Sequence, residues 1–370
     1  MSFLSPYSFL DTPSLIIDRD VALRNIAAMQ KKADELKVNL RPHIKTHRMA
    51  YFAMEQMAVG ACGIAAAKLA EAEVMADAGI PDIFIANEIV GIGKYERLRA
   101  LHRRVKIRTG VDCREQIDQI ERVFKGEKPL EVLMEYEVGE NRSGVITDEQ
   151  LTDLVSYTLT KKNVRLRGIF SHEGQSYSAA TPEECRRSSE ESYRRTLAAA
   201  DKMRALGVDV DTVSVGATPS VMSGAFMKGI TELRLGTYIF MDLGQAHAIG
   251  DFNRCAATVL ATVISRPTAE RVVLDTGAKA LVSQNRTGGI CASGGFGCVK
   301  GRESVKVEKL FDEHGLIYDR AFRDEVRVGD KVEIIPSHVC PTVNLYDEAQ
   351  LVSQGRLLEV IPVSCRGCSQ

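Results

Sequence analysis

Short apolar runs alternate with helical hydrophobic periods along the first two thirds of the chain. Residues 13–18, Pro-Ser-Leu-Ile-Ile-Asp, form a short apolar run that is typical of a strand. Residues 21–36 carry apolar side chains at spacings of three and four, which predicts an amphipathic helix, and residues 38–40 form the next short run. We expect these segments to be a strand, a helix and a second strand, the first βα unit of the fold.

The same alternation continues to residue 215. The predicted strands cover residues 63–67, 82–86, 106–109, 131–137, 166–171 and 212–215, and the predicted helices cover residues 49–59, 68–78, 95–102, 114–124, 148–159 and 182–206. About eight strands, each followed by a helix, predict a (β/α)8 TIM-type barrel. A doubly wound sheet is the alternative, but no G-x-G-x-x-G follows any of these strands.

The pattern changes after residue 250. Short β-branched runs, parted by Gly, Asp and Pro, cover residues 258–264, 271–275, 304–308, 331–335 and 358–363. This spacing predicts an all-β domain, with the glycine-rich residues 287–297 as a long loop. We therefore expect a barrel domain of residues 12–250 and a β domain of residues 251–370 that also includes residues 1–11.

Composition narrows the classes of function. The chain has 370 residues, 45% of them hydrophobic, which is enough for a sizeable core, and its net charge is −1. Lys and Arg are mixed with Asp and Glu throughout, so no face for nucleic acid or anionic lipid is indicated, and small-molecule chemistry is the default. Neither a signal sequence nor a run of about 18 apolar residues is present. We expect a soluble cytoplasmic protein.

The nine cysteines show no disulfide framework, because their number is odd and their spacing irregular. Reduced thiols in the cytosol fit this usage. Cys365 and Cys368 form a C-x-x-C near the C-terminus. It is either a redox or zinc motif or, as we favour in the absence of a second cysteine pair, two unrelated thiols.

One lysine lies between two histidines. Residues 41–48 read Arg-Pro-His-Ile-Lys-Thr-His-Arg after the predicted strand at residues 38–40. In a strand, His43, Lys45 and His47 would share one face, and the imidazoles would partly desolvate the amine for Schiff-base chemistry. A solvated basic turn is the other interpretation.

Polar residues that follow predicted strands are further candidates, because the active sites of barrels lie at the carboxyl ends of the strands. Arg142 and His172 follow two such runs. A structural, hydrogen-bonded histidine is the alternative for His172. The segment 214–220, Ser-Val-Gly-Ala-Thr-Pro-Ser, includes Gly216 and Thr218 and suits a phosphate, since backbone N–H groups are free in such a turn.

His338 and Cys340 are two residues apart in the β domain. On an extended segment both side chains would point the same way, which is ligand geometry, and a thiolate favours zinc over magnesium or manganese. A buried histidine beside a free cysteine is the alternative.

Two motifs carry a resemblance to a known family. Pro42-His-Ile-Lys-Thr-His47 and the residues Pro336-Ser-His338 with Pro341-Thr-Val-Asn344 resemble the metal-dependent D-threonine aldolases and D-serine dehydratases, which are alanine-racemase-like enzymes of pyridoxal phosphate (PLP). The resemblance extends from Thr12 to Gly367. It implies that Lys45 carries PLP and that His338 and Cys340 hold a divalent metal, zinc or else manganese or magnesium.

The resemblance also implies roles for other residues around the cofactor. Arg142 and His172 would position the ring, with Tyr177 nearby. Arg234 would face the pyridine nitrogen. The phosphate would lie against two segments that include Gly216, Thr218, Gly236, Thr237 and Tyr238.

The implied activity is a lyase acting on 3-hydroxy-D-amino acids. Cys340 matches the dehydratases, whereas the flanking residues 341–347 look more like an aldolase. We place retro-aldol cleavage of D-threonine-type substrates first and dehydration of D-serine or 3-hydroxy-D-aspartate second. A racemase and a non-catalytic PLP-binding protein are the remaining alternatives. Related two-domain enzymes close each barrel mouth with the partner's β domain, so a homodimer is expected.

Overall fold

The computed structural model describes residues 4–370, so residues 1–3 of the segment that we assigned to the β domain lie outside the described residues. The chain forms two compact units. We call residues 28–45, 50–236 and 368–370 the barrel unit, and residues 4–27, 46–49 and 237–367 the β unit. Helix α1 (Arg19–Leu36) has its first half in the β unit and its second half in the barrel unit.

The barrel unit is built on an eight-stranded parallel sheet. In the order in which they pair, its strands are β2 (Asn39–Leu40), β9 (Glu232–Leu233), β8 (Thr212–Val215), β7 (Val164–Phe170), β6 (Leu130–Glu135), β5 (Lys106–Val111), β4 (Asp82–Ile85) and β3 (Ile64–Ala66). A parallel bridge between His43 and Ala65 joins the two ends of this order. The sheet is therefore curled into a barrel, which confirms the predicted fold class.

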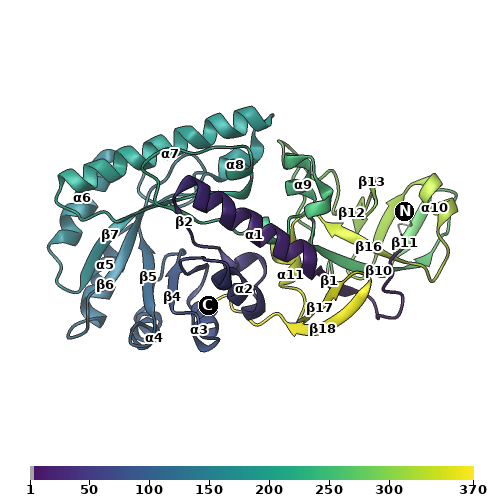
Figure 1. The fold of residues 1–370 in the computed structure, drawn as a ribbon, viewed down its shortest axis with the longest axis horizontal. Helices are drawn as coiled ribbons and strands as arrows, with labels where there is room; N and C mark the ends of the chain where they lie inside the picture. The colour runs from purple at the N-terminus through teal and green to yellow at the C-terminus, as the bar shows by residue number, and fades with distance from the viewer. Residues whose placement is uncertain (1–3) are drawn as a thin grey trace. The chain divides into compact units, whose positions relative to one another are not determined.

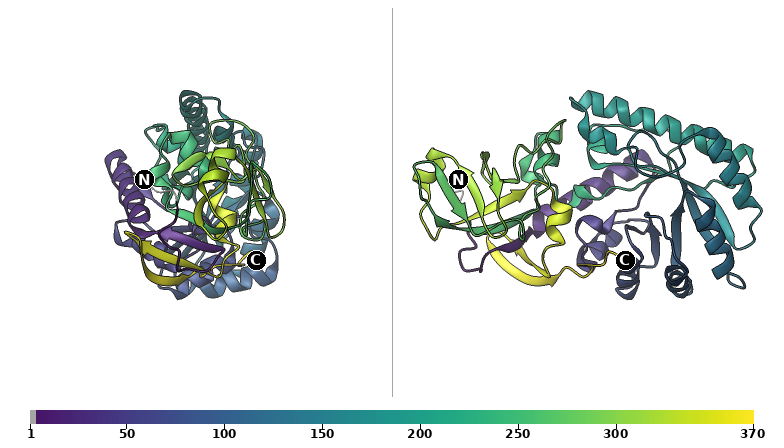
Figure 2. Two further views of the ribbon diagram at one scale, coloured as in Figure 1. Left: turned by 90° about the vertical axis from the view of Figure 1, so that its right-hand side faces the viewer. Right: turned by 180° about the vertical axis from the view of Figure 1, so that it is seen from behind.

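Helices alternate with these strands and lie on the outside of the sheet (Figure 1). They are α2 (Ala50–Ala58), α3 (Leu69–Asp77), α4 (Ile92–His102), α5 (Arg114–Val123), α6 (Asp148–Leu159), α7 (Pro182–Ala205) and α8 (Thr218–Met222). The view from behind in Figure 2 shows α7 as the long teal helix along one side of the barrel. The chain ends on this unit, where the Ala70 N–H donates to the Gln370 carbonyl at 3.1 Å.

Local sequence explains where these helices begin. Thr147 caps α6 by accepting the Gln150 N–H, and Thr181 caps α7 by accepting the Glu184 N–H. Pro182 then occupies the first turn of α7, where its missing N–H costs nothing. Among the described residues, no helix is both long enough and apolar enough to cross a membrane.

Aromatic side chains fill part of the barrel interior. Phe84 of β4 and Phe170 of β7 meet edge to face with ring centroids 5.1 Å apart, and they pack with Ala65 and Leu133. A Cβ at Gly110 would come within 2.7 Å of the Phe170 ring, so the glycine of β5 makes room for it. The interior is thus a packed core, as in other barrels of this kind.

The β unit contains a ten-stranded sheet and three short helices. Its strands are β1 (Ser14–Asp18), β10 (Ala257–Ser265), β11 (Arg271–Leu274), β12 (Gly297–Val299), β13 (Arg302–Lys306), β14 (Lys309–Leu310), β15 (Gly315–Tyr318), β16 (Lys331–Pro336), β17 (Glu348–Ser353) and β18 (Arg356–Pro362). The helices are α9 (Leu243–Ile249), α10 (Arg320–Glu325) and α11 (Val339–Val343). Its core includes valines and isoleucines of β10, β11 and β16.

Strand β1 differs from the expectation for the first βα unit. It pairs antiparallel with β10 and parallel with β17 in the sheet of the β unit, and not with any barrel strand. The first barrel strand is β2, and β9 completes the eight. A short apolar strand followed by a helix suits either sheet, and only its hydrogen-bonding partners distinguish the two.

Candidate active site

Lys45 lies in a single 3-10 turn, η1 (Ile44–Thr46), directly after the bridge that closes the barrel. Its side chain is half-buried, and its backbone N–H donates to His43 Nδ1 at 3.4 Å. The expectation of a strand with His43, Lys45 and His47 on one face is wrong, because β2 ends at Leu40 and the chain turns at residue 44. Lys45 still lies at the carboxyl end of a barrel strand.

Arg142 and His172 line one small cleft of the barrel unit together with Glu135, Glu137 and Glu140. Arg142 forms an ion pair with Glu140 at 3.3 Å, and a second guanidinium nitrogen is 4.0 Å from Glu135. The structure therefore brings together two site residues that are 30 positions apart.

Two histidines of the barrel unit are kept neutral. Burial lowers the pKa of both His43 and His172 well below the usual value, and the positive charges of Lys45, Arg142 and Arg234 lower it further. A neutral imidazole retains one nitrogen lone pair, so each ring can accept a proton or a hydrogen bond at neutral pH. Tyr177, in the turn η2 (Gly174–Ser178), has its ring centroid 6.4 Å from that of His172.

The segment expected to hold a phosphate is partly occupied by a side chain that the sequence reasoning missed. Glu173 is fully buried, and its carboxylate accepts the N–H groups of Gly216 at 3.2 Å and Ala217 at 2.7 Å. These two N–H groups are therefore not free, contrary to the expectation. Glu173 follows β7 by three residues, and its position after a strand was the signal available in the sequence.

Thr218 begins helix α8, directly after this turn, and is 1% exposed. Its Oγ1 is a buried hydroxyl oxygen without a hydrogen-bond partner within residues 4–370. Gly216 has φ +125°, and a Cβ there would lie 3.0 Å from Leu235 Cδ2, so the side chain of Leu235, two residues after β9, packs closely against this turn. A buried hydroxyl beside a tight glycine turn suits a phosphate oxygen.

Arg234 follows β9 and is 6% exposed. One of its terminal nitrogens donates to the Ser171 carbonyl at 2.8 Å, but its Nε–H has no partner in the described part of the chain. The guanidinium carbon lies 5.2 Å from the Phe170 ring centroid. Burial lowers the pKa of Arg234, opposed by the charges of Glu232, Glu135 and Glu173. A buried N–H donor of this kind suits an acceptor atom of a bound group.

The remaining cofactor candidates lie where the chain passes between the units. Gly236 is the last barrel residue before Thr237 and Tyr238, which belong to the β unit in the turn η3 (Thr237–Ile239). Thr237 Oγ1 is 4.0 Å from Cys340 Sγ, and Tyr238 is 1% exposed.

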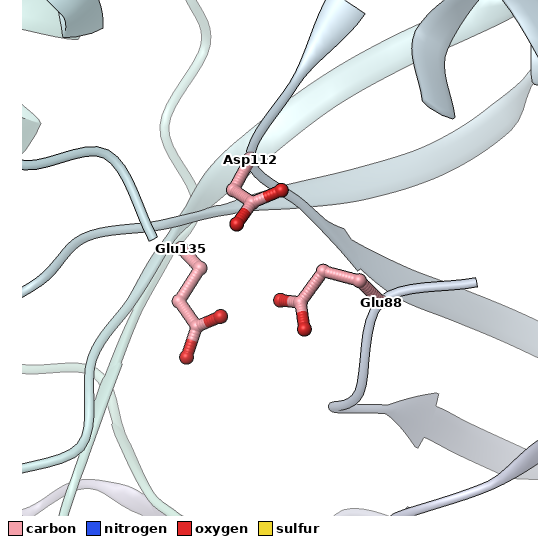
Figure 3. Close-up of side chains that lie close together, drawn as sticks. All are labelled: Glu88, Asp112 and Glu135. Carbon is pink, nitrogen blue, oxygen red and sulfur yellow. The ribbon is translucent and has the colours of Figure 1, made fainter. Parts of the chain in front are cut away.

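Three carboxylates converge at the ends of consecutive barrel strands (Figure 3). Glu88 follows β4, Asp112 follows β5 and Glu135 ends β6, and one oxygen of each lies within 4.8 Å of the others. Burial, a hydrogen bond to Glu135 and the charges of Glu135 and Asp112 raise the pKa of Glu88 to about 9. Glu88 therefore keeps its proton at neutral pH, since carboxylates this close cannot all ionise cheaply. The sequence reasoning did not select this cluster.

His338 and Cys340 lie at the start of helix α11 in the β unit. His338 is the N-cap residue and Cys340 is in the first turn, so the expected extended geometry is wrong for Cys340. His338 Nδ1 lies 2.8 Å from Gln284 Oε1, and Thr46 Oγ1 lies 3.3 Å from Cys340 Sγ. Burial lowers the pKa of His338, but the negative charge of Cys340, a hydrogen bond to Cys340 and the negative charge of Asp242 outweigh it, so the net shift of the pKa is upward.

The donor atoms in the two units suit different groups. In the barrel unit, the amine of Lys45 and two buried donors without a partner among residues 4–370, the hydroxyl of Thr218 and the Nε–H of Arg234, fit a cofactor with an aldehyde, a phosphate and a ring nitrogen. In the β unit, an imidazole and a thiol two residues apart fit a borderline-soft cation such as zinc. The acidic cluster is, among the described residues, the one group of three or more potential metal ligands found close together, and it does not include this pair.

The fold and these strand-end residues define an alanine-racemase-like enzyme architecture. Residues 17–244 match the family "Alanine racemase, N-terminal domain", and residues 256–352 match "Putative serine dehydratase domain". The first match covers more than half of the chain, so the protein belongs to that family.

Several similar proteins and structures are enzymes that act on hydroxy-amino acids, by the names that they carry. The chain is 32% identical to a D-threonine aldolase of Arthrobacter sp, over 99% of this chain and 95% of the relative. It is 33% identical to a D-threo-3-hydroxyaspartate dehydratase of Delftia sp. over 90% and 92%. The crystal structure of D-threonine aldolase from Filomicrobium marinum aligns with a TM-score of 0.85 at 32% identity, covering 98% of each chain. The chain is thus similar to both aldolases and dehydratases, which confirms the family predicted from the sequence.

Proposed function

We propose that this protein is a PLP- and divalent-metal-dependent lyase that cleaves 3-hydroxy-D-amino acids, with D-threonine-type substrates giving glycine and an aldehyde. The observation that carries the proposal is the pair of buried donors without partners, Thr218 Oγ1 and Arg234 Nε, at the ends of β8 and β9 within residues 4–370. Barrels hold phosphates at their seventh and eighth strands. The similarity to the Arthrobacter D-threonine aldolase over 99% of the chain supports the reaction class.

Each barrel residue has a role in this proposal. Lys45 would hold PLP through its Nζ, Thr218 would donate to the phosphate, and Arg234 would donate Nε–H to the ring nitrogen. Because a guanidinium donates and does not accept, that nitrogen would stay unprotonated. The neutral ring of His172 would lie against the cofactor, with Arg142 held by Glu140 and Glu135 beside it.

The β unit would supply the metal ligands. His338 presents Nε2 when its Nδ1–H donates to Gln284, and Cys340 presents its sulfur. When bound, PLP withdraws electrons from the substrate α-carbon and the metal polarises the β-hydroxyl. A base would take the hydroxyl proton as the Cα–Cβ bond breaks and the aldehyde forms, and a proton returned to the α-carbon would complete glycine.

Dehydration is the second candidate, and Cys340 favours it. If Lys45 takes the α-proton, the β-hydroxyl leaves as hydroxide, and hydrolysis releases a 2-oxo acid and ammonia. The relatives include D-serine dehydratases as well as the Delftia enzyme, so this outcome has equal support among them.

One assay separates the two reactions. The enzyme is given D-threonine, D-serine and a 3-hydroxy-D-aspartate with zinc or manganese, and glycine and ammonia are measured separately. We expect glycine from D-threonine. Ammonia without glycine would show that the reaction is dehydration and that the aldolase proposal is wrong. Activity that survives both EDTA and His338→Ala would remove the metal from the proposal, and no turnover of any D-amino acid would favour a PLP-binding protein.

The proposal includes a homodimer, by analogy with related two-domain enzymes. Light scattering at micromolar concentration should give about twice the mass of 40.7 kDa. A monomer would contradict this part of the proposal alone.

A further inference from the structure

Asp242 connects two short helices of the β unit. It is fully buried, and each of its carboxylate oxygens accepts one backbone N–H: Oδ1 from Gln245 at 2.9 Å and Oδ2 from Val339 at 3.1 Å. The first contact caps α9, and the second reaches the first residue of α11. A buried carboxylate that accepts two N–H groups is strongly held, because such bonds are charge-assisted.

Val339 is the residue between His338 and Cys340. The carboxylate of Asp242 therefore holds the peptide that connects the two proposed metal ligands. Thr342 adds a second restraint, since its hydroxyl donates to the His338 carbonyl at 2.9 Å. The distance between an imidazole nitrogen and a thiol two residues away depends on the backbone dihedrals of this segment as well as on the side-chain dihedrals, so these contacts limit how far the ligands can separate.

Gln284 fixes the imidazole itself. Its Oε1 lies 2.8 Å from His338 Nδ1, and an amide oxygen only accepts, so Nδ1 carries the hydrogen, and Nε2 of the neutral ring keeps its lone pair. The backbone carbonyl of Gln284 also accepts the Ser337 hydroxyl at 2.8 Å. Gln284 is thus tied to the residue before His338 as well as to its ring.

We propose that Asp242 and Gln284 are positioning residues for the metal-ligand pair, with Asp242 holding the backbone between the ligands and Gln284 selecting the tautomer that frees Nε2. The inference rests on the proposed function, in which His338 and Cys340 bind the metal. Partners that orient a ligating histidine are worth about 10–100-fold in metal affinity.

Zinc affinity tests the roles of both residues. Metal is removed from the full-length protein, and zinc binding is measured by competition with a chromophoric chelator. Gln284→Met removes the acceptor at similar size, whereas Gln284→Glu retains it. We expect Gln284→Met and Asp242→Asn to weaken zinc binding about 10–100-fold and Gln284→Glu to bind as wild type does.

Asp319→Asn is the matched control, because Asp319 caps α10 of the same unit by accepting the Phe322 N–H and touches neither ligand. It should leave zinc affinity unchanged. Hydrogen exchange of the metal-free protein supplies a second readout: Asp242→Asn should speed exchange in residues 338–343, and Asp319→Asn should not.

Two failures are distinguishable. If His338→Ala abolishes zinc binding while Gln284→Met and Asp242→Asn bind as tightly as wild type, the positioning roles are overturned and the metal assignment stands. If wild type binds zinc no better than His338→Ala, the metal assignment itself fails, and this inference fails with it. If Asp242→Asn does not fold, the pair of Gln284 variants decides.

Discussion

The barrel unit and the β unit prepare their site residues in different ways. In the barrel unit, buried donors at the strand ends, Thr218 Oγ1 and Arg234 Nε, have no partner among residues 4–370. In the β unit, the two contacts that orient His338 and the peptide after it are made by Gln284 and Asp242. Buried donors without a partner suit a large polar cofactor, which brings its own acceptor atoms. Ligands that are already oriented by hydrogen bonds within the protein suit a single metal ion.

The two units also differ in how deeply their charged side chains are buried. In the barrel unit, Arg41 is 4% exposed and lies 2.7 Å from both Glu232 and Asp82. In the β unit, the buried Glu333 accepts from Thr258 at 2.7 Å and pairs with Lys300, whose side chain is 40% exposed. The barrel thus depends on an enclosed ion network, and the β sheet depends mainly on its apolar core.

The largest expected effect comes from Lys45→Ala. If the barrel unit holds PLP through this amine, the variant loses the visible absorption band of the lysine-bound cofactor, and lyase activity falls on the order of 10³-fold or more. Absorption spectra and steady-state rates check both. If the band persists in the variant, another lysine must hold the cofactor, and the proposed difference between the two units would be wrong.

Arg41→Met should cost more stability than Lys300→Met. Removing Arg41 leaves two carboxylates without their buried partner, for which we expect a loss of about 3–5 kcal/mol in the free energy of unfolding. The half-exposed Lys300 should be worth about 1 kcal/mol or less. Urea denaturation of the two variants measures the difference, and equal losses would show that the units do not differ in how they carry buried charge.

Zinc should stabilise the protein through the β unit alone. At a free zinc concentration of 100 times the Kd, the expected gain is about 2.7 kcal/mol, seen as a higher Tm. His338→Ala should abolish this gain, and EDTA should reverse it in wild type. A gain of the same size in His338→Ala would indicate that zinc binds elsewhere, with the carboxylates of Figure 3 as the first place to examine.

The last expected effect depends on pH and concerns Glu88→Gln. The pKa of Glu88 is raised from 4.5 to about 9 on folding, so folding retains a proton that the unfolded chain releases above pH 4.5. This contribution to stability is complete below pH 4.5 and is lost progressively as the pH rises towards 9. Glu88→Gln should remove that loss, so the stability of this variant relative to wild type should rise as the pH increases from 4.5 towards 9. Parallel pH profiles of the two proteins would show that Glu88 ionises normally.

Most of the barrel could be predicted from periodicity. Strands β3 to β8 and helices α2 to α7 lie within a few residues of the predicted segments, because each has a regular hydrophobic period and is bounded by glycine or polar residues. Strand β1 was placed in the barrel by its neighbours in sequence, yet its partners are β10 and β17. The pairing of β1 depends on contacts between residues more than 200 positions apart, and the local hydrophobic pattern does not encode such contacts.

The sequence by itself determined the fold class, the family and the chemical types of the site, because a lysine, an arginine, a histidine and a thiol keep their chemistry wherever they lie. Only the tertiary structure decided their surroundings. In the folded chain Lys45 lies in a turn, and the Gly216 and Ala217 N–H groups donate to Glu173. Glu88, Asp112 and Glu135 lie close together at the ends of three strands. These arrangements depend on burial and on contacts across the barrel, and both arise only when the sheet closes.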